Sequence, residues 1–457
     1  MSYAATLSDI AEAIGAQHLG ENVEVAQLST DTRKIADGDL FLALRGDNFD
    51  GQAFCAQAVA KGAIALVVEQ PQALGVPQLV VADTRLALGE IAKFNRAQYR
   101  GPLIAVTGSN GKTTTKELIA SILDVRGPSL ATQGNLNNDI GVPLTLLRLD
   151  GSQGLAVVEM GANARGEIAY SVALAQPDVA IITNAMAAHL EGFGSLQGVV
   201  EAKGEIFDGL GAEGTAVINL DDPHCQYWLA RNRARKIMGF SLESDTADVY
   251  ASEIEAQASG CYSFTLNIQG QSRRISLPLL ARHNIANALA AAAAAFSIGL
   301  SLDEIAQGLN TVVPASGRLN SRLGLEGATI IDDSYNGNPD SVKAGVDLLV
   351  ALEGTKILAL GDMAELGPQA RQLHGDVGAY AAQQGVDYLL SCGPLGAAAS
   401  TEFTRLSGRE LMAFQSREAL ITQLKKMVDV NTKVLIKGSL SAGMKQVVEA
   451  MTTQEHN

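Results

Sequence analysis

One stretch of the chain brings together residue types that bind phosphate. An apolar run of strand type ends at Thr107, good helix formers follow Thr113, and Gly108 and Gly111 stand between them. Glycine lets the backbone bend and approach a ligand closely, and the free N–H groups at a helix start attract an anion. Lys112 can reach terminal phosphates, and the Thr113 hydroxyl can hold a magnesium ion. The stretch therefore predicts a nucleotide phosphate site.

The spacing of this phosphate loop departs from the commonest form. That form is G-x-x-x-x-G-K-[ST], whereas here Ser109 and Asn110 alone separate the two glycines, and Thr114 follows Thr113. The alternative is an ordinary glycine-rich turn with a stray lysine. We favour the phosphate site because strand, glycines, lysine, paired threonines and helix occur together and in order. We expect ATP as the nucleotide, although this stretch does not itself separate ATP from GTP.

The composition indicates a multidomain α/β protein and disfavours some partners. The 457 residues correspond to about three domains, and 47% of them are hydrophobic while 5% are aromatic. A formal charge of -15 disfavours nucleic acid and anionic membranes as main partners, because both need clustered lysine and arginine. The cysteines lack metal or redox spacing, which suits a reducing cytosol; they are Cys55, Cys225, Cys261 and Cys392.

Targeting and membrane signals are not expected. The first residues lack the basic start and apolar core of a signal peptide. The longest apolar tract, Ala286 to Leu300, is dominated by alanine and falls short of the roughly 20 strongly apolar residues of a membrane helix. We therefore expect a cytoplasmic protein in which this tract is a packed helix.

Residues 1–98 are predicted to form a small α/β domain. Apolar residues at helical spacing from Leu7 to Ile14 indicate an opening helix, with Ser8 as a possible cap and Gly15 at its end. The strand-like runs that follow are 23–28, 40–44, 63–68 and 78–81, with a helical stretch at 52–61. Two polar turns are candidates for ligand contact, although each alone is more often a solvated turn. One spans 45–51, and the other contains Ser29, Thr30, Asp31 and Arg33.

Residues 99–315 are predicted to form a central parallel-sheet domain around the phosphate loop. The strand-like run 155–158 leads to Glu159, at the edge of a parallel sheet where ligands bind. Glu159 is therefore a candidate magnesium ligand or base. Asn135, Asn137 and Asn138 lie in an amide-rich run that is either an irregular loop or a substrate loop.

Further candidates follow in the same domain. The run 179–183 leads to Asn184 and His189, and its place in the sheet favours function for a histidine that would otherwise be structural. Lys203 would by default be a surface helix residue. Alternating residues from 248 to 279 predict an antiparallel β insert. Asn284 and Asn287 come one helical turn apart just after it and can face one ligand.

Residues 316–457 are predicted to form a Rossmann-like domain. Strand-like runs at 330–332, 357–360, 388–390 and 434–436 alternate with helical stretches. Polar segments follow three of these strands, at 333–340, 361–367 and 437–439. No G-x-G-x-x-G fingerprint accompanies the sheet, so a dinucleotide cofactor is not expected.

Together these motifs resemble the Mur ligase family, the ATP-dependent amide-forming enzymes of peptidoglycan precursor synthesis. The resemblance covers essentially the whole chain. It rests on the phosphate loop, Glu159-Met160-Gly161, Asn184 with His189, Lys203-Gly204-Glu205, the run 283–288, Gly317-Arg318, the run 333–339 and Lys437-Gly438-Ser439. Within the family, the runs 135–143 and 360–367 are most similar to the member that uses D-alanyl-D-alanine as acceptor. Leu440 stands where an arginine usually follows Lys-Gly-Ser, which affects one contact near the acceptor.

The resemblance implies a reaction and a set of partners. ATP would phosphorylate the terminal carboxylate of a UDP-N-acetylmuramoyl tripeptide, and the amine of D-alanyl-D-alanine would attack the resulting acyl phosphate. Catalysis would then consist mostly of positioning and of neutralising phosphate charge, which these residues allow. We also expect a monomer, with no nucleic acid or membrane partner.

The resemblance assigns roles to the candidate residues. Lys112 would neutralise phosphate charge, Thr113 and Glu159 would hold one Mg²⁺, and His189 with a carbamylated Lys203 would surround a second. The residues implied to hold ATP are Gly108, Ser109, Asn110, Gly111, Lys112, Thr113, Thr114, Asn284, Asn287, Arg318, Asp333 and Tyr335. The candidate substrate contacts are Ser29, Thr30, Asp31, Arg33, Asn135, Asn137, Asn138, Asn336, Asn338 and Lys437.

Two other readings of the chain stay open at this point. Folylpolyglutamate synthase shares the central and C-terminal pattern, but its phosphate loop typically lies near the start of the chain, unlike the loop here. A non-catalytic nucleotide-binding regulator would predict loss of the charged site residues. Those residues are Lys112, Glu159, His189 and Lys203, and all four are present.

Overall fold

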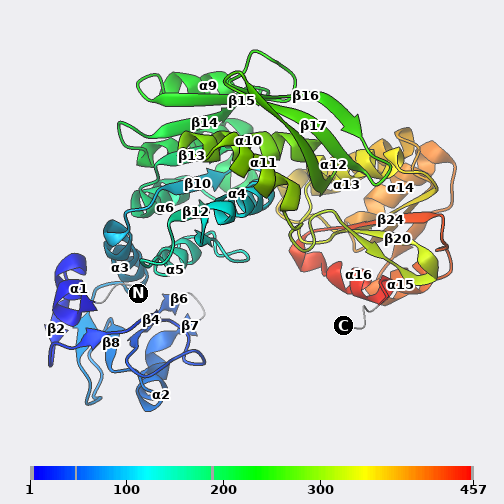
Figure 1. The fold of residues 1–457 in the computed structure, drawn as a ribbon. Coiled ribbons are helices and arrows are strands. Elements are labelled where there is room, and N and C mark those ends of the chain that lie inside the picture. The colour runs from blue at the N-terminus through cyan, green and yellow to red at the C-terminus, as the bar shows by residue number, and fades with distance from the viewer. Residues whose placement is uncertain (1–4, 47–48, 187–189, 454–457) are drawn as a thin grey trace.

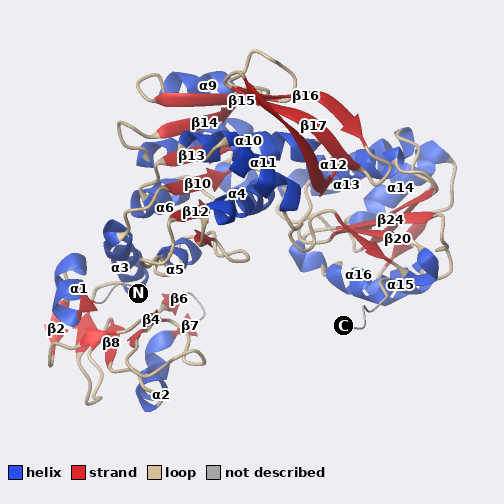
Figure 2. Ribbon diagram, in the orientation of Figure 1, coloured by secondary structure: helices blue, strands red, loops and turns tan. Residues whose placement is uncertain are grey.

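The computed structural model describes residues 5–46, 49–186 and 190–453. Three larger sheets follow one another along the chain, and Figure 1 shows the central one between the N-terminal and the C-terminal parts. Helices cover the sheets in all three parts (Figure 2). The predicted three-part α/β architecture is confirmed. Within the described ranges, no helix is long and apolar enough to cross a bilayer.

The N-terminal part is built on a five-stranded sheet. Its strands are β2 (Gln17–Leu19), β4 (Leu28–Ser29), β5 (Leu40–Leu42), β8 (Ala65–Val68) and β9 (Gln78–Val80). Their order is β2-β9-β8-β5-β4, antiparallel between β2 and β9 and parallel elsewhere. Two short antiparallel pairs are β1 (Ala5–Thr6) with β3 (Glu24–Val25), and β6 (Arg45–Gly46) with β7 (Phe49–Asp50). The helices are α1 (Leu7–Ile14), η1 (Gly51–Phe54), α2 (Cys55–Ala60) and α3 (Thr84–Gln98).

Two predictions for the N-terminal part were wrong in detail. Helix α1 is capped by Thr6 rather than Ser8, because Thr6 and Asp9 exchange the side-chain to backbone hydrogen bonds of a capping box. The run 23–28 forms two strands rather than one, because β3 pairs with β1 whereas β4 pairs with β5. Gly15 does end the helix, in the left-handed conformation at φ 63°.

Helix α3 was not predicted, and it ties the N-terminal part to the central sheet. The Asp83 side chain caps it by accepting the backbone N–H of Arg85 at 2.7 Å. Towards the end of the helix, the buried Asn95 Nδ2 donates to the Leu146 carbonyl of α5 (Gly141–Leu146) in the central part, at 3.0 Å. Leu88 and Ile91 share a buried cluster with residues of the central sheet. The helix therefore packs on both parts.

The central sheet has nine strands. They are β10 (Leu103–Thr107), β11 (Ser129–Ala131), β12 (Leu155–Glu159), β13 (Val179–Ile182), β14 (Thr215–Asn219), β15 (Lys236–Ser241), β16 (Val249–Ala256), β17 (Cys261–Ile268) and β18 (Gln271–Leu280). Their order is β11-β12-β10-β13-β14-β15-β16-β17-β18. All neighbours up to β16 are parallel, and β16, β17 and β18 pair antiparallel. The predicted antiparallel segment is therefore present as an extension of the parallel sheet.

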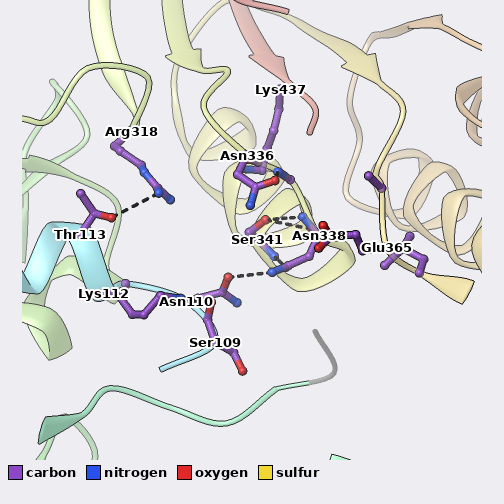
Figure 3. A pocket seen from close by; sticks show the side chains of 14 residues that line it. Ser109, Asn110, Lys112, Thr113, Arg318, Asn336, Asn338, Ser341, Glu365 and Lys437 are labelled. Carbon is purple, nitrogen blue, oxygen red and sulfur yellow. Dashed lines mark hydrogen bonds between the residues drawn. The ribbon is translucent and has the colours of Figure 1, made fainter. Parts of the chain in front are cut away.

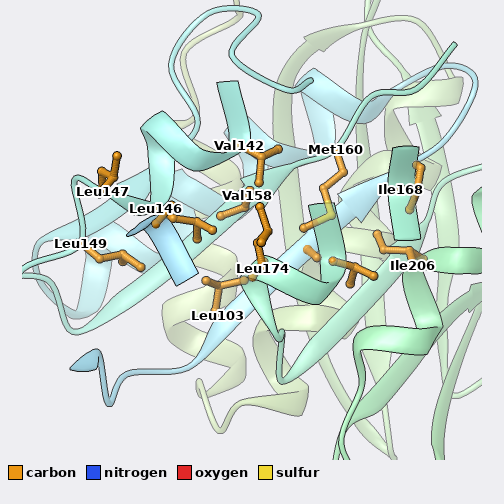
Figure 4. Packing of buried hydrophobic residues seen from close by; sticks show 14 of the residues in the cluster. Leu103, Val142, Leu146, Leu147, Leu149, Val158, Met160, Ile168, Leu174 and Ile206 are labelled. Atoms are coloured by element: carbon orange, nitrogen blue, oxygen red, sulfur yellow. The ribbon is translucent and has the colours of Figure 1, made fainter. Parts of the chain in front are cut away.

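Strand β10 is buried on both faces because its residues alternate between two clusters. Ile104 and Val106 belong to a cluster that also holds residues of α4 (Lys112–Arg126), α10 (His283–Ser297) and α11 (Leu302–Thr311). Leu103 and Ala105 belong to the opposite cluster, and Figure 4 labels Leu103, Leu174 and Val158 among its members. The helices of that side are α5, α6 (Glu167–Ala175), α8 (Leu196–Gly204) and η2 (Glu205–Gly209), and the remaining central helices are α7 (Leu190–Phe193) and α9 (Cys225–Arg231). This two-sided burial fixes where the strand ends and the phosphate loop begins.

The C-terminal sheet has six strands. They are β19 (Asn320–Leu323), β20 (Thr329–Asp333), β21 (Thr355–Gly361), β22 (Tyr388–Cys392), β23 (Met412–Phe414) and β24 (Thr432–Lys437). The order is β19-β20-β24-β21-β22-β23, parallel except between β19 and β20. The helices are η3 (Leu325–Gly327), α12 (Pro339–Ala351), η4 (Gly367–Gln369), α13 (Ala370–Gln383), α14 (Gly396–Ser407), α15 (Arg417–Leu424), η5 (Leu440–Ala442) and α16 (Lys445–Met451). The four predicted strands are confirmed, and β19 and β23 are additional edge strands.

Helices α13 and α14 touch closely at a glycine. A Cβ added to Gly378 would lie 2.0 Å from the Ala399 carbonyl oxygen, so the two backbones meet there without a side chain between them. Helix α13 also carries His374, whose Nε2 accepts the backbone N–H of Met363 at 2.8 Å. The helix pair therefore supports the loop that follows β21.

We expect Gly378→Ala to lower the free energy of unfolding by about 1–3 kcal/mol, because the added methyl group would force the two helices apart. Gly375→Ala on the same helix is the matched control, since its Cβ would meet a Glu402 side-chain atom at 3.2 Å rather than backbone. Urea unfolding followed by circular dichroism measures both variants. Equal stability of the two would contradict the close contact.

Candidate active site

The phosphate loop joins β10 to α4 through two glycines in unusual conformations. The φ angles are 155° at Gly108 and 81° at Gly111. A Cβ on Gly108 would lie 1.8 Å from Thr183 Oγ1, and one on Gly111 would lie 2.4 Å from Asn287 Oδ1. Both the backbone and the packing therefore require glycine. Gly111 also offers no side chain to cap α4, which leaves the first N–H groups of that helix for an anion.

Residues after the neighbouring strand β13 hold the loop in shape. The Asn110 N–H donates to Asn184 Oδ1 at 2.9 Å, and Asn184 Nδ2 donates back to the Asn110 carbonyl at 3.1 Å. Thr183 Oγ1 donates to the same carbonyl at 2.6 Å. The loop is thus bonded to the adjacent strand before any ligand binds, which reduces the ordering cost of binding.

Lys112 bends back over the loop. Its Nζ donates to the carbonyls of Gly108 and Ser109 at 2.7 and 3.3 Å. Burial lowers the pKa of Lys112, the Glu159 carboxylate opposes that shift, and the positive Arg318 adds to it. An anion in the loop would favour the charged lysine, because it would offset both the burial and the repulsion.

Glu159 is the last residue of β12 and is oriented by its neighbours. Its Oε1 accepts from Asn137 Nδ2 at 2.8 Å and from Thr113 Oγ1 at 3.3 Å, and its N–H donates to Thr132 Oγ1 at 2.9 Å. The second carboxylate oxygen, Oε2, is buried and has no hydrogen-bond partner. A buried carboxylate oxygen without a partner costs free energy unless a cation or donor meets it.

The donors around Glu159 fit a magnesium ion. Mg²⁺ prefers hard oxygen ligands, and it usually binds one or two carboxylates together with substrate phosphates and water. Thr113 and Glu159 supply a hydroxyl and a carboxylate of this kind. No cluster of three His, Cys, Asp or Glu side chains able to hold a metal exists among the residues that the structure describes. An ion here would therefore take its other ligands from phosphate and water.

Lys203 is buried at the end of α8, which overturns the default expectation of a surface lysine. Its exposure is 3%, and its Nζ lies 5.8 Å from the centre of the Phe193 ring. Burial and the positive charge of Lys112 place the pKa of Lys203 well below its ordinary value. His189, which is predicted to lie beside it, falls outside the described residues.

The C-terminal part completes the pocket in front of the phosphate loop. Asn338 Nδ2 donates to Asn110 Oδ1 at 2.8 Å, and Arg318 Nη2 donates to Thr113 Oγ1 at 3.4 Å (Figure 3). The Arg318 guanidinium also stacks on Tyr335, 4.3 Å from the ring centre. Its Nε is buried and has no hydrogen-bond partner in the structure, so this cation can still bind an anion.

Asn284 and Asn287 face a second pocket behind the loop, as their spacing predicts. Asn287 Nδ2 donates to Asn284 Oδ1 at 2.8 Å, and both residues are buried. This pocket has a volume of about 260 Å³. It is also lined by residues at or near the ends of β13, β14 and β15, and by the segment that leads into the C-terminal part. Its lining includes Thr114, Asn219, Phe240, Arg318, Leu319 and Asp333. Its mixture of apolar and amide groups suits a nucleoside.

Several lining residues were not singled out from the sequence. Phe240 ends in this pocket from β15, and Leu319 comes from the segment that enters the C-terminal part. Asn219 is the last residue of β14, so the rule that ligands meet the carboxyl ends of parallel strands could have found it. No such pattern marks Phe240 or Leu319, because only the fold brings them together.

Asp333 and Lys437 form a buried ion pair in the C-terminal part. Lys437 Nζ bonds to the Asp333 carboxylate and donates to the Asn336 carbonyl at 3.0 Å. The pair joins the ends of β20 and β24, which are neighbours in the sheet. Because both charges are satisfied by each other, they shape the pocket wall and keep Asn336 in place.

The remaining sequence candidates divide into two groups. In the amide-rich run, Asn138 Oδ1 accepts the Gly141 N–H at 2.8 Å at the start of α5, and Asn135 is exposed. The N-terminal candidates lie in another part of the molecule, at the end of β4 and just after it (Figure 1). There the Arg33 guanidinium hydrogen-bonds the Asp31 carboxylate and lowers its pKa to about 2. Ser29 and Thr30 precede this pair, and the four are not brought to the phosphate loop.

Comparison with known proteins covers the same three parts of the chain. Profiles described as "Mur ligase family, catalytic domain", "Mur ligase middle domain" and "Mur ligase, glutamate ligase domain" match residues 24–96, 106–295 and 317–440. The UDP-N-acetylmuramoyl-tripeptide--D-alanyl-D-alanine ligase of Escherichia coli (strain K12) is 44% identical to this chain, over 98% of each.

Solved structures agree with that similarity. MurF from Acinetobacter baumannii superposes with a TM-score of 0.91 at 37% identity, covering 98% of each chain. MurF ligase from Thermotoga maritima, solved in complex with ADP, gives a TM-score of 0.84 at 26% identity over 93% of this chain and 96% of that one. A phosphate loop that faces a second α/β part across a pocket, in a chain this similar to named ligases, indicates a nucleotide-dependent enzyme. The chain belongs to the Mur ligase family.

We expect Glu159→Gln to weaken nucleotide binding in the presence of Mg²⁺ at least about tenfold, because the variant loses the anionic oxygen that a metal would meet. Binding measured with EDTA should change little. Isothermal titration with ADP, with and without Mg²⁺, separates the two effects. Glu213→Gln, an exposed glutamate of the same part, is the matched control. Equal loss with and without metal would contradict a metal-ligand role for Glu159.

Proposed function

We infer that this chain joins D-alanyl-D-alanine to a UDP-N-acetylmuramoyl tripeptide at the cost of ATP, in peptidoglycan precursor synthesis. The observation that carries this is the phosphate loop bonded across the pocket to Arg318 and Asn338, in a chain 44% identical over its length to a ligase of that name. A folylpolyglutamate synthase-like activity is disfavoured, because residues 24–96 match the first Mur ligase profile. A regulator without catalysis is disfavoured by the retained charged residues.

The three parts divide the substrates in this proposal. Residues 1–98 bind the UDP-sugar end, residues 99–315 bind ATP, and residues 316–457 bind the acceptor dipeptide. Ser29, Thr30, Asp31 and Arg33 are the polar groups offered at the UDP end. Asn336, Asn338 and Lys437 stand near the phosphate loop and are offered to the reacting groups.

The chemistry follows from the weakness of a carboxylate as an electrophile. Transfer of the γ-phosphoryl group of ATP to the tripeptide carboxylate releases ADP and creates an acyl phosphate, whose phosphate is a good leaving group. The amine of D-alanyl-D-alanine attacks the acyl carbon, and phosphate leaves as the amide forms. The protein must align three groups and stabilise charge on the phosphoryl oxygens.

The residues around the loop supply that charge stabilisation. The Lys112 ammonium moves from the Gly108 carbonyl to the phosphates, and the N–H groups at the start of α4 point at them. Arg318 meets the same charge from the C-terminal part. Asn284 and Asn287 hold the nucleoside in the pocket behind the loop, with Tyr335 and Asp333 on its C-terminal wall.

Two magnesium sites complete the proposal. Thr113 and Glu159 hold the first, and His189 with a carbamylated Lys203 surrounds the second. Magnesium bound there neutralises phosphate charge and aligns the γ-phosphoryl group. Carbamylation suits Lys203, because a bare ammonium would repel a metal ion whereas a carbamate offers anionic oxygens.

We expect Lys112→Ala to fold normally and to reduce turnover about 10²- to 10³-fold, because one well-placed electrostatic group is lost at the migrating phosphoryl group. Phosphate release with all three substrates measures turnover, and circular dichroism checks the fold. Lys425→Ala is the control, since that lysine is exposed on the C-terminal part. Turnover above half that of the wild type would exclude the role given to Lys112.

We expect labelled bicarbonate to give a carbamate carbon-13 resonance on the wild-type enzyme that is missing from Lys203→Arg. The carbamate forms from neutral amine, and burial together with Lys112 lowers the pKa of Lys203, so the neutral form persists to lower pH than for an ordinary lysine. Acidification through that lowered pKa should protonate the amine and remove both the resonance and the activity. Full turnover without a carbamate signal would favour direct contact of Lys203 with the γ-phosphate.

A further inference from the structure

The loop between β21 and η4 brings an acidic side chain to the phosphate pocket. Within it, Met363 and Leu366 are buried, with exposures of 0% and 7%, whereas Ala364 and Glu365 between them are exposed. Ala364, Glu365 and Leu366 line the same pocket as Lys112. Figure 3 shows Glu365 beyond Asn338 as seen from the phosphate loop.

The base of this loop is held rigidly. His374 Nε2 accepts the Met363 N–H at 2.8 Å, while His374 Nδ1 bonds to the Ala370 carbonyl at 2.7 Å. Asp362 Oδ1 accepts the Gly396 N–H at 2.7 Å at the start of α14. The Asp362 carbonyl accepts from both the backbone N–H and the hydroxyl of Ser439, at 2.9 and 2.7 Å. Anchors on three separate elements fix where the exposed tip projects.

The tip itself has an unusual backbone. Glu365 has a φ of 61°, in the left-handed region that residues other than glycine, asparagine and aspartate rarely adopt. Such conformations persist where the surroundings over-determine them, and they gather at functional sites. A turn with this backbone conformation would usually have glycine at this position, whereas here the residue carries a long, charged side chain.

The other charges in the pocket suggest a role for the Glu365 carboxylate. Lys112 and Arg318 line this pocket as cations, whereas Lys437 is paired with Asp333. Glu365 is the one carboxylate among the described lining residues. ATP and the acyl phosphate are anions, so these cations attract them. The acceptor dipeptide arrives with an ammonium group at neutral pH, which those cations would repel. A carboxylate at the rim offers that ammonium an attractive partner close to the reacting carbon.

We propose that Glu365 binds the amino group of the acceptor dipeptide and so selects an amine nucleophile. This inference rests on the proposed ligase function and adds the residue that recognises the attacking group. The Glu365 carboxylate accepts hydrogen bonds from the ammonium as the dipeptide enters. The anchored loop places Glu365 in the wall of the pocket that Lys112 also lines.

Glu365→Gln tests the charge, and Glu365→Gly tests the backbone. Both variants should raise the KM for D-alanyl-D-alanine about 10- to 100-fold, which is the usual cost of losing a hydrogen bond to a charged group. The KM values for ATP and for the UDP-linked tripeptide should stay unchanged. Glycine adopts a positive φ without strain, so a purely conformational role for residue 365 would leave Glu365→Gly normal. Glu410→Gln, an exposed glutamate of the same part, is the control.

A second ligand separates recognition of the amine from general damage. Propionyl-D-alanine keeps the shape of the dipeptide but lacks the ammonium, and its inhibition constant should be equal in wild type and Glu365→Gln. Equal weakening of this inhibitor, or an unchanged acceptor KM in either variant, would overturn the inference alone. Wild-type enzyme that releases no phosphate with D-alanyl-D-alanine would overturn the proposed function as well.

Discussion

The turn from Gly108 to Gly111 constrains the elements around it, because it leaves the start of α4 without a side-chain cap while both of its glycines are closely packed. The Thr183 side chain, just after β13, lies close to Gly108, and the Asn287 side chain of helix α10 lies close to Gly111. Neither glycine can gain a methyl group without moving one of these neighbours. The positions of β13 and α10 are therefore tied to this open turn, and the second pocket, which Asn284 and Asn287 line, lies beside α10.

Two sheets share the site, and neither holds it alone. The central sheet supplies the phosphate loop and Glu159, whereas Arg318, Asn338 and Glu365 come from the C-terminal part. Some contacts that cross between them are apolar, where Leu280 shares a buried cluster with Leu348, but those at the phosphate loop are polar, such as the amide pair of Asn338 with Asn110. Polar contacts of this kind form and break at small net free energy, because water replaces them. An enzyme that must admit three substrates and then exclude water is suited by such a boundary.

Local charge in the site runs against the charge of the whole chain. The formal charge is -15, yet Lys112, Lys203 and Arg318 gather around the phosphate loop. Burial makes each of these cations costly, and it makes their attraction to an anionic ligand stronger than it would be in water. Lys437 is different, because Asp333 already neutralises it and the pair acts as a fixed wall of the pocket.

Elements whose signal is local could be predicted from the sequence. The strand, glycines and helix of the phosphate loop, the strand that delivers Glu159, and the one-turn spacing of Asn284 and Asn287 depend on neighbours within a few residues. Other features depend on contacts between residues that are distant in the chain. These are the burial of Lys203 and the hydrogen bond from Asn137 to Glu159. Phe240 and Glu365 likewise line pockets whose other residues come from distant segments. Contacts between distant residues depend on how sheets and helices pack in three dimensions, and a period of two or of 3.6 residues carries no information about that packing.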